Sequence, residues 1–192
     1  MADDATPVLR RRAGAGQTVT LRRPRALSRS DGAMHDALSA ELKAAAADAA
    51  VRCVVITGAG RGFCAGQDLS DPAAAPDLTP GAQPRDIGNL IEARYKPLAM
   101  LLHHFPVPVI AAVNGVAAGA GANLALNCDI VLAAKSASFI QAFSKIGLVP
   151  DCGGTWLLPR LVGRASAMAL ALLGDKCSAE EAQRLGKIWR GV

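Results

Sequence analysis

The sequence has few of the residues from which metal and redox sites are built. Its 192 residues include three histidines and five cysteines, and no cysteine pair has the Cys-x-x-Cys spacing of zinc or dithiol sites. We therefore expect no metal site. The odd cysteine count, with no secretory signal at the N-terminus, favours reduced thiols in a cytoplasmic protein.

Long apolar runs and aromatic side chains are also scarce. No uninterrupted apolar run approaches the roughly 20 residues that a membrane-spanning helix needs, and aromatic residues make up 4% of the chain. The chain as a whole is 51% hydrophobic and rich in alanine. This composition predicts one soluble globular domain of α/β or helical class, with no membrane partner.

Positive charge is concentrated near the N-terminus. The net charge is +5, and seven arginines lie within the first thirty residues: Arg10, Arg11, Arg12, Arg22, Arg23, Arg25 and Arg29. Such a cluster can attract nucleic acid or a phosphate-bearing ligand. Because no aromatic side chains interleave with the arginines, we expect no nucleic acid partner. We expect residues 1–16 to be a disordered basic N-terminus and residues 17–192 to form the domain.

Periodicity predicts alternating strands and helices. Short apolar or alternating runs predict strands at Gln17–Arg22, Cys53–Thr57 and Val109–Val113. Helical spacing predicts helices at Met34–Ala50 and Ile87–His104. The order of elements indicates an α/β fold with short parallel strands.

Turn and cap signals complete this pattern. Ser30 or Asp31 can cap the first helix, and Ser178 begins a capping box that opens a final helix. Pro72–Pro84 contains four prolines and predicts an exposed loop. Two further helical segments are predicted at Thr155–Leu161 and Ala165–Leu173.

The first glycine-rich turn does not fit a dinucleotide site. Thr57–Gly62 follows an apolar strand, but a G-x-G-x-x-G fingerprint would need glycine where Phe63 stands. The dehydrogenase form of the motif would need glycine at Cys64, and Tyr95 is followed four positions later by Ala99 instead of lysine. We therefore reject a dinucleotide cofactor.

A second glycine-rich turn follows the strand Val109–Val113. Gly119 and Gly121 let backbone N–H groups approach a ligand closely, and the helix that follows adds a partial positive charge. Further along, the turn Val149–Gly154 carries one acidic side chain, Asp151. An oxyanion-binding turn and a lone carboxylate together predict acid/base chemistry beside a stabilised negative charge.

These segments, in this order, resemble the enoyl-CoA hydratase/isomerase (crotonase) family. The resembling motifs are RP-x-AL at Arg23–Leu27, TGAGRGFCAGQDL at Thr57–Leu69, PVPVIAAVNGVAAGAGANLALNCDIVLA at Pro106–Ala133, GLVPDCGGTWLLPRLVGRA at Gly147–Ala165 and SAEEA at Ser178–Ala182. Within the family, Gly147–Ala165 is most similar to the ring-1,2-epoxyphenylacetyl-CoA isomerases of phenylacetate breakdown. The resemblance implies a crotonase-like α/β fold, a spiral core of ββα repeats, and an acyl-CoA thioester as substrate.

The resemblance also implies a set of site residues. In this family two backbone N–H groups hold the thioester oxygen, and by motif position they belong here to Gln67 and Ala120. One such donor is typically worth about 3 kcal/mol to the developing oxyanion. The other substrate- and CoA-binding positions that the motifs imply are Arg25, Leu27, Ala65, Gly66, Asp68, Leu69 and Gly119.

Asp151 stands where isomerases of the family place their catalytic aspartate. We expect burial among Val149, Trp156 and Leu157 to raise its pKa towards working pH. The resemblance therefore predicts an acyl-CoA isomerase that acts on a double bond or a ring epoxide through a stabilised enolate, with Asp151 as acid/base. It implies no metal and no redox cofactor. A plain turn residue is the alternative for Asp151, because Pro-Asp-x-Gly is a common turn signal.

Two alternative functions stay open. Hydratases of the family use two glutamates, and those positions hold Asn123 and Phe143 here. The missing glutamates disfavour water addition, and a hydratase is kept as the alternative enzyme. A non-catalytic CoA-binding or RNA-binding module is the alternative of another class. Family members continue beyond Trp189 into helices that cover the acyl pocket and form trimer contacts. The resemblance thus implies an incomplete C-terminal helical region, and a homo-oligomer (a trimer or a dimer of trimers) if those helices are not essential.

Overall fold

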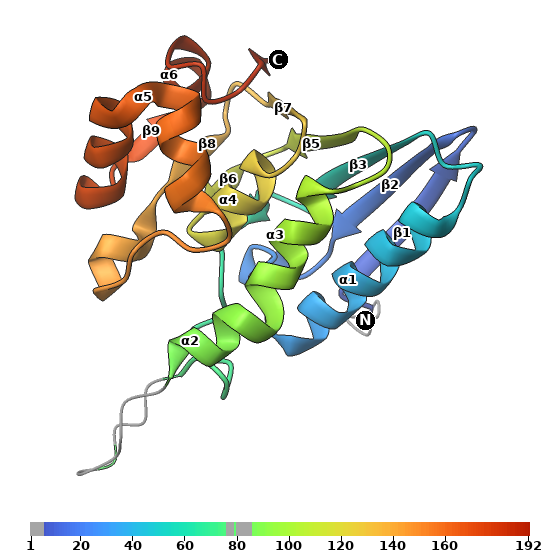
Figure 1. Cartoon of the computed structure of the whole chain (residues 1–192), viewed down its shortest axis with the longest axis horizontal. Coiled ribbons are helices and arrows are strands. Elements are labelled where there is room, and N and C mark those ends of the chain that lie inside the picture. The colour runs from blue at the N-terminus through green and yellow to red at the C-terminus, as the bar shows by residue number, and fades with distance from the viewer. Residues whose placement is uncertain (1–5, 76–78, 80–85) are drawn as a thin grey trace.

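The structure is a computed structural model that describes residues 6–75, 79 and 86–192. Within these residues, strands and helices alternate as predicted (Figure 1). The predicted loop Pro72–Pro84 falls largely on residues outside the described part of the chain.

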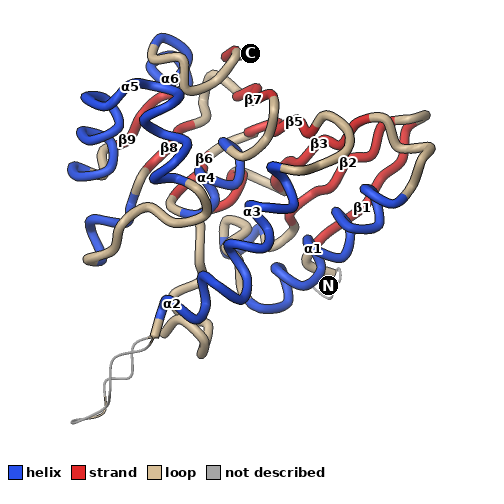
Figure 2. The backbone as a smooth tube through the Cα atoms, viewed as in Figure 1, coloured by secondary structure: helices blue, strands red, loops and turns tan. Residues whose placement is uncertain are grey.

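A six-stranded sheet forms one layer of the molecule (Figure 2). Its strands, in spatial order, are β1 (Val8–Ala13), β2 (Gly16–Leu21), β3 (Cys53–Gly58), β5 (Val109–Val113), β7 (Ile130–Ala133) and β10 (Arg190–Gly191). All neighbouring pairs are parallel except β1 and β2, which form an antiparallel hairpin. The strands predicted at Gln17–Arg22, Cys53–Thr57 and Val109–Val113 are confirmed to within a residue at each end.

A second sheet of four short strands carries the candidate site. Its spatial order is β4 (Gly62–Cys64), β6 (Val116–Ala118), β8 (Ser138–Ile140) and β9 (Lys176–Ser178). Consecutive strands of the chain enter different sheets: β3, β5 and β7 join the larger one, while β4, β6 and β8 join the smaller one. A helix follows each pair, so the core is the predicted spiral of ββα repeats.

Six α-helices are described, and two of them begin directly after cap residues that the sequence marks. They are α1 (Gly32–Ala47), α2 (Ile87–Leu90), α3 (Lys96–His103), α4 (Ala120–Leu126), α5 (Gly154–Leu173) and α6 (Ala179–Arg184), with 3₁₀ turns η1 (Pro24–Ala26) and η3 (Ala142–Ile146) and a π-helical segment η2 (Ile91–Tyr95). The Asp31 carboxylate accepts a hydrogen bond from Met34 N at 2.9 Å, and the Ser178 hydroxyl accepts one from Glu181 N at 3.1 Å. These bonds satisfy N–H groups of the first helical turn that have no partner within the helix. Helices α1 and α3 contact each other and lie on the same face of the larger sheet (Figure 1).

Strand β1 corrects the prediction that residues 1–16 are disordered, for the part of that segment that the structure describes. Residues from Val8 to Ala13 pair with β2 over six positions, and a two-residue turn with Gly14 at φ 56° connects the strands. Val8 is buried, while the arginines that follow it are exposed. Charged side chains are compatible with an edge strand because they face water and discourage pairing with another chain. The domain therefore begins at least nine residues before position 17.

Helix α5 is the one described helix that is long and apolar enough to cross a membrane by length and composition, with a mean hydropathy of 1.3. Its backbone is interrupted at Gly163, where φ is 74° and ψ is 163°. The apolar length is thus divided between two shorter helices, which match the predicted Thr155–Leu161 and Ala165–Leu173. Neither piece reaches the roughly 20 residues that a bilayer requires.

Candidate active site

The two glycine-rich turns lie side by side because β4 and β6 are parallel neighbours. A Cβ added to Gly66 would lie 2.9 Å from the Ala118 oxygen and 3.4 Å from the Ala120 nitrogen. Gly66 has φ 85°, a backbone conformation that side chains rarely adopt, so glycine permits both the turn and the close approach. Gly121 leaves similar room, since a Cβ there would clash with the Cys64 carbonyl.

Two backbone N–H groups at these turns have no partner within the protein. Neither Gln67 N nor Ala120 N donates a hydrogen bond to another atom of the described residues. Ala120 is the first residue of α4, where the aligned peptide dipoles add a partial positive charge. Unpaired N–H groups are costly when they are removed from water, so these two are available to a ligand oxygen.

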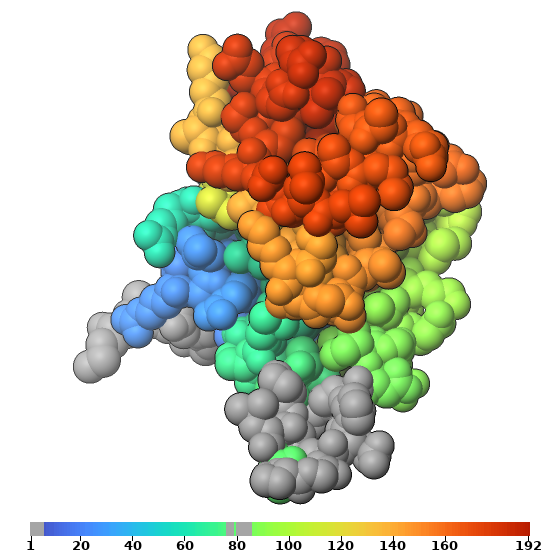
Figure 3. Space-filling view, turned by 90° about the vertical axis from the view of Figure 1, so that its left-hand side faces the viewer, coloured from blue at the N-terminus to red at the C-terminus, as the bar shows by residue number. Residues whose placement is uncertain are grey.

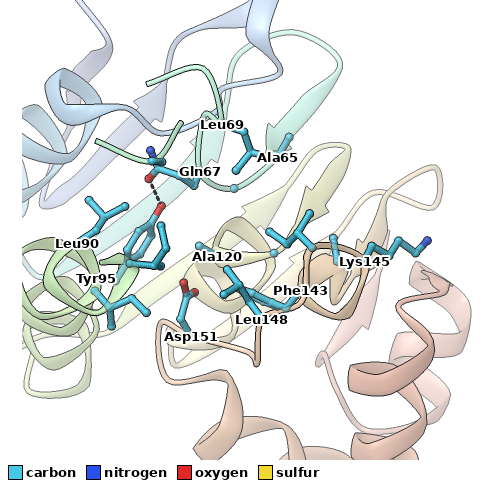
Figure 4. Close-up of a pocket in the computed structure, with 17 residues that line it drawn as sticks. Ala65, Gln67, Leu69, Leu90, Tyr95, Ala120, Phe143, Lys145, Leu148 and Asp151 are labelled. Atoms are coloured by element: carbon cyan, nitrogen blue, oxygen red, sulfur yellow. Dashed lines mark hydrogen bonds between the residues drawn. The ribbon is translucent and has the colours of Figure 1, made fainter. Parts of the chain in front are cut away.

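A cavity of about 210 Å³, partly open to solvent, lies beside both turns. Seven of the predicted site residues line it: Ala65, Gly66, Gln67, Leu69, Gly119, Ala120 and Asp151. Most of its other walls are apolar and come from α2, η2 and η3 (Figure 4). The structure thus gathers residues from three distant segments of the sequence around one hollow.

Asp151 is the only carboxylate among the described residues that line this cavity. Burial raises the pKa of Asp151 to about 6, although a hydrogen bond from its own backbone N–H opposes the shift. Its Oδ1 atom is buried without a hydrogen-bond partner in the described part of the protein. Lys145 also lines the cavity, but its amine points away from Asp151 (Figure 4).

The expected neighbours of Asp151 do not line its cavity. Trp156 is 58% exposed and Val149 is 75% exposed, and Leu157 is likewise absent from the cavity walls. Cavity residues Tyr95, Phe143 and Leu148 lie around it instead (Figure 4). The direction predicted for the pKa is confirmed, and its cause is burial.

Asn123 in α4 and Asn127, directly after the last residue of α4, hold the turn that carries Asp151. Asn123 Nδ2 donates to the Asp151 carbonyl at 2.9 Å, and Asn127 Nδ2 donates to the Cys152 carbonyl at 2.7 Å. Cys152 has φ 47°, which is unfavourable for a residue with a side chain. These hydrogen bonds help to hold a strained turn directly after the carboxylate.

The two positions at which hydratases carry glutamates differ in environment. Asn123 is fully buried, and its Oδ1 accepts a hydrogen bond from Gln141 Nε2 at 2.8 Å. Phe143 lines the cavity with an aromatic ring. Neither side chain can exchange a proton with a substrate.

Three predicted binding residues do not line the cavity. The buried Asp68 carboxylate forms ion pairs with Arg23 at 3.0 Å and Arg29 at 3.5 Å, so it fixes the loop that follows the first turn. Leu27 contributes its carbonyl to this loop by accepting a hydrogen bond from Ala65 N at 3.1 Å. Arg25 is exposed and forms no ion pair with a described residue.

The N-terminal arginines are less free than their number suggests. Besides Arg23 and Arg29, Arg12 pairs with Asp48 at 3.0 Å and Arg10 lies 3.7 Å from Glu41. These ion pairs join β1 and the segment Arg23–Arg29 to the rest of the domain, and they reduce the charge available for a polyanion.

The geometry agrees with comparisons to known proteins. The family model of enoyl-CoA hydratase/isomerase matches residues 12–192. The chain therefore belongs to the enoyl-CoA hydratase/isomerase family. It is 57% identical over 175 residues to a 1,2-epoxyphenylacetyl-CoA isomerase of Escherichia coli, a match that covers 91% of this chain and 65% of the relative. A probable enoyl-CoA hydratase of Rhodobacter capsulatus is 49% identical over 174 residues, covering 91% of this chain and 64% of the relative.

Solved structures show the same fold. A putative enoyl-CoA hydratase/isomerase from Mycobacterium abscessus superimposes with a TM-score of 0.88 at 37% identity, over 96% of this chain and 70% of the other. An enoyl-CoA hydratase from Bacillus anthracis gives a TM-score of 0.87 at 31% identity, over 97% of this chain and 70% of the other. The chain spans slightly less than two thirds of the length of the curated relatives named above.

Proposed function

We propose that the protein is an acyl-CoA isomerase in which Asp151 moves the proton. The observation that carries this proposal is the single carboxylate in an otherwise apolar cavity, with its pKa raised to about 6. A carboxyl group of this pKa can both remove and return a proton near neutral pH. The 57% identity to an E. coli 1,2-epoxyphenylacetyl-CoA isomerase supports the same activity.

The reaction follows from the positions of three groups. Asp151 removes a proton from a carbon near the thioester, and the electron pair of that C–H bond moves towards the thioester oxygen. The N–H groups of Gln67 and Ala120 stabilise the resulting enolate, each by about 3 kcal/mol. Protonated Asp151 then returns the proton to a different carbon. No oxidation or reduction occurs, so we propose that the reaction requires no metal and no redox cofactor.

The substrate that we propose is a CoA thioester with an apolar acyl group derived from phenylacetate. Leucine, isoleucine and phenylalanine side chains on the cavity walls support an apolar acyl group, and the name of the E. coli relative supports phenylacetate. Arg25 is proposed to contact the CoA phosphates, which its free guanidinium suits. The ion pairs of Arg10, Arg12, Arg23 and Arg29 support the absence of a nucleic acid partner.

We further propose a cytoplasmic homo-oligomer, a trimer or a dimer of trimers. All five cysteines are free thiols, which suits a reducing compartment. Exposed apolar side chains on α5 support an assembly of several copies.

An assay of double-bond migration in a β,γ-enoyl-CoA tests the activity. Asp151→Asn should reduce turnover by at least about 100-fold, because general acid–base catalysis contributes on the order of 10²–10⁴. Asp48→Asn, which changes an exposed carboxylate outside the cavity, is the control. Equal activity of parent and Asp151→Asn would remove Asp151 from the mechanism. Hydration of crotonyl-CoA by the parent would favour the hydratase instead.

A further inference from the structure

Tyr95 contacts all three segments of the candidate site. Its hydroxyl donates a hydrogen bond of 2.6 Å to Gln67 Oε1 in the first turn (Figure 4). Its ring belongs to a small buried cluster with Ala120, in the second turn, and Cys152, directly after Asp151. Tyr95 is 3% exposed. No sequence motif indicates its role, because the contact joins residues 28 positions apart.

A local distortion of the helix places this side chain. Residues Ile91–Tyr95 form a π-helical turn between α2 and α3, and Lys96 N donates to the carbonyl of Ile91, five residues earlier. Pro97 follows directly and has no N–H with which to continue an α-helical ladder. Ile91 and Tyr95 in the wider turn, and Leu90 directly before it, all line the cavity. Such π-turns are frequent at functional sites.

His35 supports the ring from behind. The two ring centroids lie 4.5 Å apart at an interplanar angle of 87°, an edge-to-face arrangement. His35 is buried, and burial together with Arg94 lowers its pKa to about 4, so the ring is neutral at pH 7. Tyr95 is therefore held in place by α1 on one side and by the site on the other.

The hydrogen bond from Tyr95 restrains the cavity side of the glycine-rich turn that contains Gln67. Backbone bonds from Ser30 N to the Gly66 oxygen and from Asp68 N to the Ser30 oxygen, both 2.8 Å, hold the two residues that flank Gln67. The Gln67 N–H itself has no partner within the described residues. The other side-chain bond of Gln67, from Nε2 to the Asp68 oxygen, is long at 3.3 Å. The short bond from Tyr95 is thus the strongest side-chain restraint on Gln67.

We propose that Tyr95 is a positioning residue of the isomerase, whose hydroxyl orients Gln67 so that the backbone N–H of Gln67 points at the thioester oxygen. The inference rests on the proposed function for its chemistry. Tyr95 acts through Gln67 and through the packing of Ala120 and Cys152. Loss of the hydroxyl should weaken the oxyanion site without changing the volume of the cavity.

The test compares Tyr95→Phe and Gln67→Leu, which remove the two ends of the same hydrogen bond, with Thr57→Val. Thr57 makes a hydroxyl bond of 2.8 Å to the Ala112 oxygen and does not line the cavity, so Thr57→Val measures the loss of a hydroxyl bond elsewhere. Two quantities are measured on the full chain. They are kcat and KM with a β,γ-enoyl-CoA, and the carbonyl stretching frequency of a bound saturated acyl-CoA labelled with ¹³C at the thioester. The second reports the strength of the N–H contacts without turnover.

Tyr95→Phe and Gln67→Leu should each lower kcat about tenfold or more with KM changed less than about threefold, as for a weakened transition-state contact. Both should also move the bound carbonyl frequency towards its value in water, and the double variant should be no worse than either single one. Thr57→Val should lower the melting temperature alone. An active parent whose kcat and carbonyl frequency are unchanged in both variants overturns the inference.

The two proposals fail in different ways. A parent that binds the labelled thioester with a lowered carbonyl frequency but does not isomerise the enoyl-CoA would contradict the proposed function. The frequency shift in the variants would still decide the role of Tyr95. A parent that leaves the carbonyl frequency at its value in water would overturn the inference, because Gln67 N–H would then not contact the thioester.

Discussion

The buried carboxylate of Asp151 should make the folded protein less stable at neutral pH. Its pKa is raised to about 6 from an ordinary value of 3.8, so the folded state holds the proton more tightly than the unfolded state does. The stability that comes from this proton is fully present below about pH 3.8 and is lost as the pH rises through 6. The group that the mechanism needs therefore opposes folding at the pH where it would work.

Asp151→Asn should consequently stabilise the protein above pH 7 while removing activity. We expect a gain of about 1–2 kcal/mol in the free energy of unfolding, less than the full shift implies because the side chain is partly exposed. The gain should shrink as the pH falls from 6 towards 4, where the parent carboxyl also becomes neutral. Urea unfolding at pH 8 and at pH 4.5 measures both values. A variant that is equally or less stable than the parent at pH 8 would contradict the raised pKa.

Some site residues could be identified from the sequence and others could not. Gln67, Ala120 and Asp151 lie in motifs whose turn chemistry is local, and the structure brings them to one cavity. Tyr95 could not be found, because nothing local indicates a hydrogen bond to a residue 28 positions away. Asp68 was predicted to bind the ligand, but it forms ion pairs with two arginines instead. The sequence does not indicate these pairs, because the arginines lie about forty positions earlier in the chain.

At the scale of elements, length separates the strands that periodicity found from those that it missed. β3 and β5 are five or six residues long and apolar, so their patterns are clear. β4, β6 and β8 have three residues each, too few to show alternation, and they become strands through pairing with each other. β1 was not predicted because its consecutive arginines show no apolar alternation, although charged residues are compatible with an edge strand.

The contact between the two glycine-rich turns can be tested with a pair of glycines. Gly66 and Gly147 both have positive φ, 85° and 72°, but only Gly66 lies close to other atoms, since nothing lies within 4 Å of a Cβ at Gly147. Gly147→Ala should therefore cost only backbone strain, about 1 kcal/mol. Gly66→Ala should cost at least about 1 kcal/mol more, because its Cβ would push the Ala118 carbonyl and Ala120 N–H away.

Thermal unfolding and the isomerase assay measure these effects together. Gly66→Ala should lower both the melting temperature and kcat, whereas Gly147→Ala should lower the melting temperature slightly and leave the turns in place. Equal effects of the two substitutions on stability and on kcat would show that the turns do not need their close approach.

At the scale of the whole molecule, α5 presents an apolar surface to water. Trp156, Met168, Leu172 and Leu173 are 58%, 46%, 64% and 63% exposed. The space-filling view shows this part of the chain on the outside of the molecule, in orange (Figure 3). Large exposed apolar patches are typical of surfaces that contact another protein.

We therefore expect the chain to self-associate through α5. Sedimentation velocity should show an oligomer that grows with protein concentration. The double substitution Met168→Lys with Leu172→Lys should shift it towards a monomer, because burying two charges at an apolar contact is costly. Leu9→Lys, at a side chain that is 40% exposed on β1, is the matched control and should have no effect. A monomer at all concentrations, or an oligomer that survives the double substitution, would exclude this surface.

The two unpaired N–H groups at the cavity belong to the main chain, and this has a consequence for how the protein can diversify. No exchange of one amino acid for another, short of proline, deletes a peptide N–H. The side chains of Leu69, Leu90 and Phe143, in contrast, form the walls and can change freely in size. Substitutions in the walls, by selection or by engineering, can therefore change which acyl group binds, while the two backbone N–H groups that would contact the thioester stay the same.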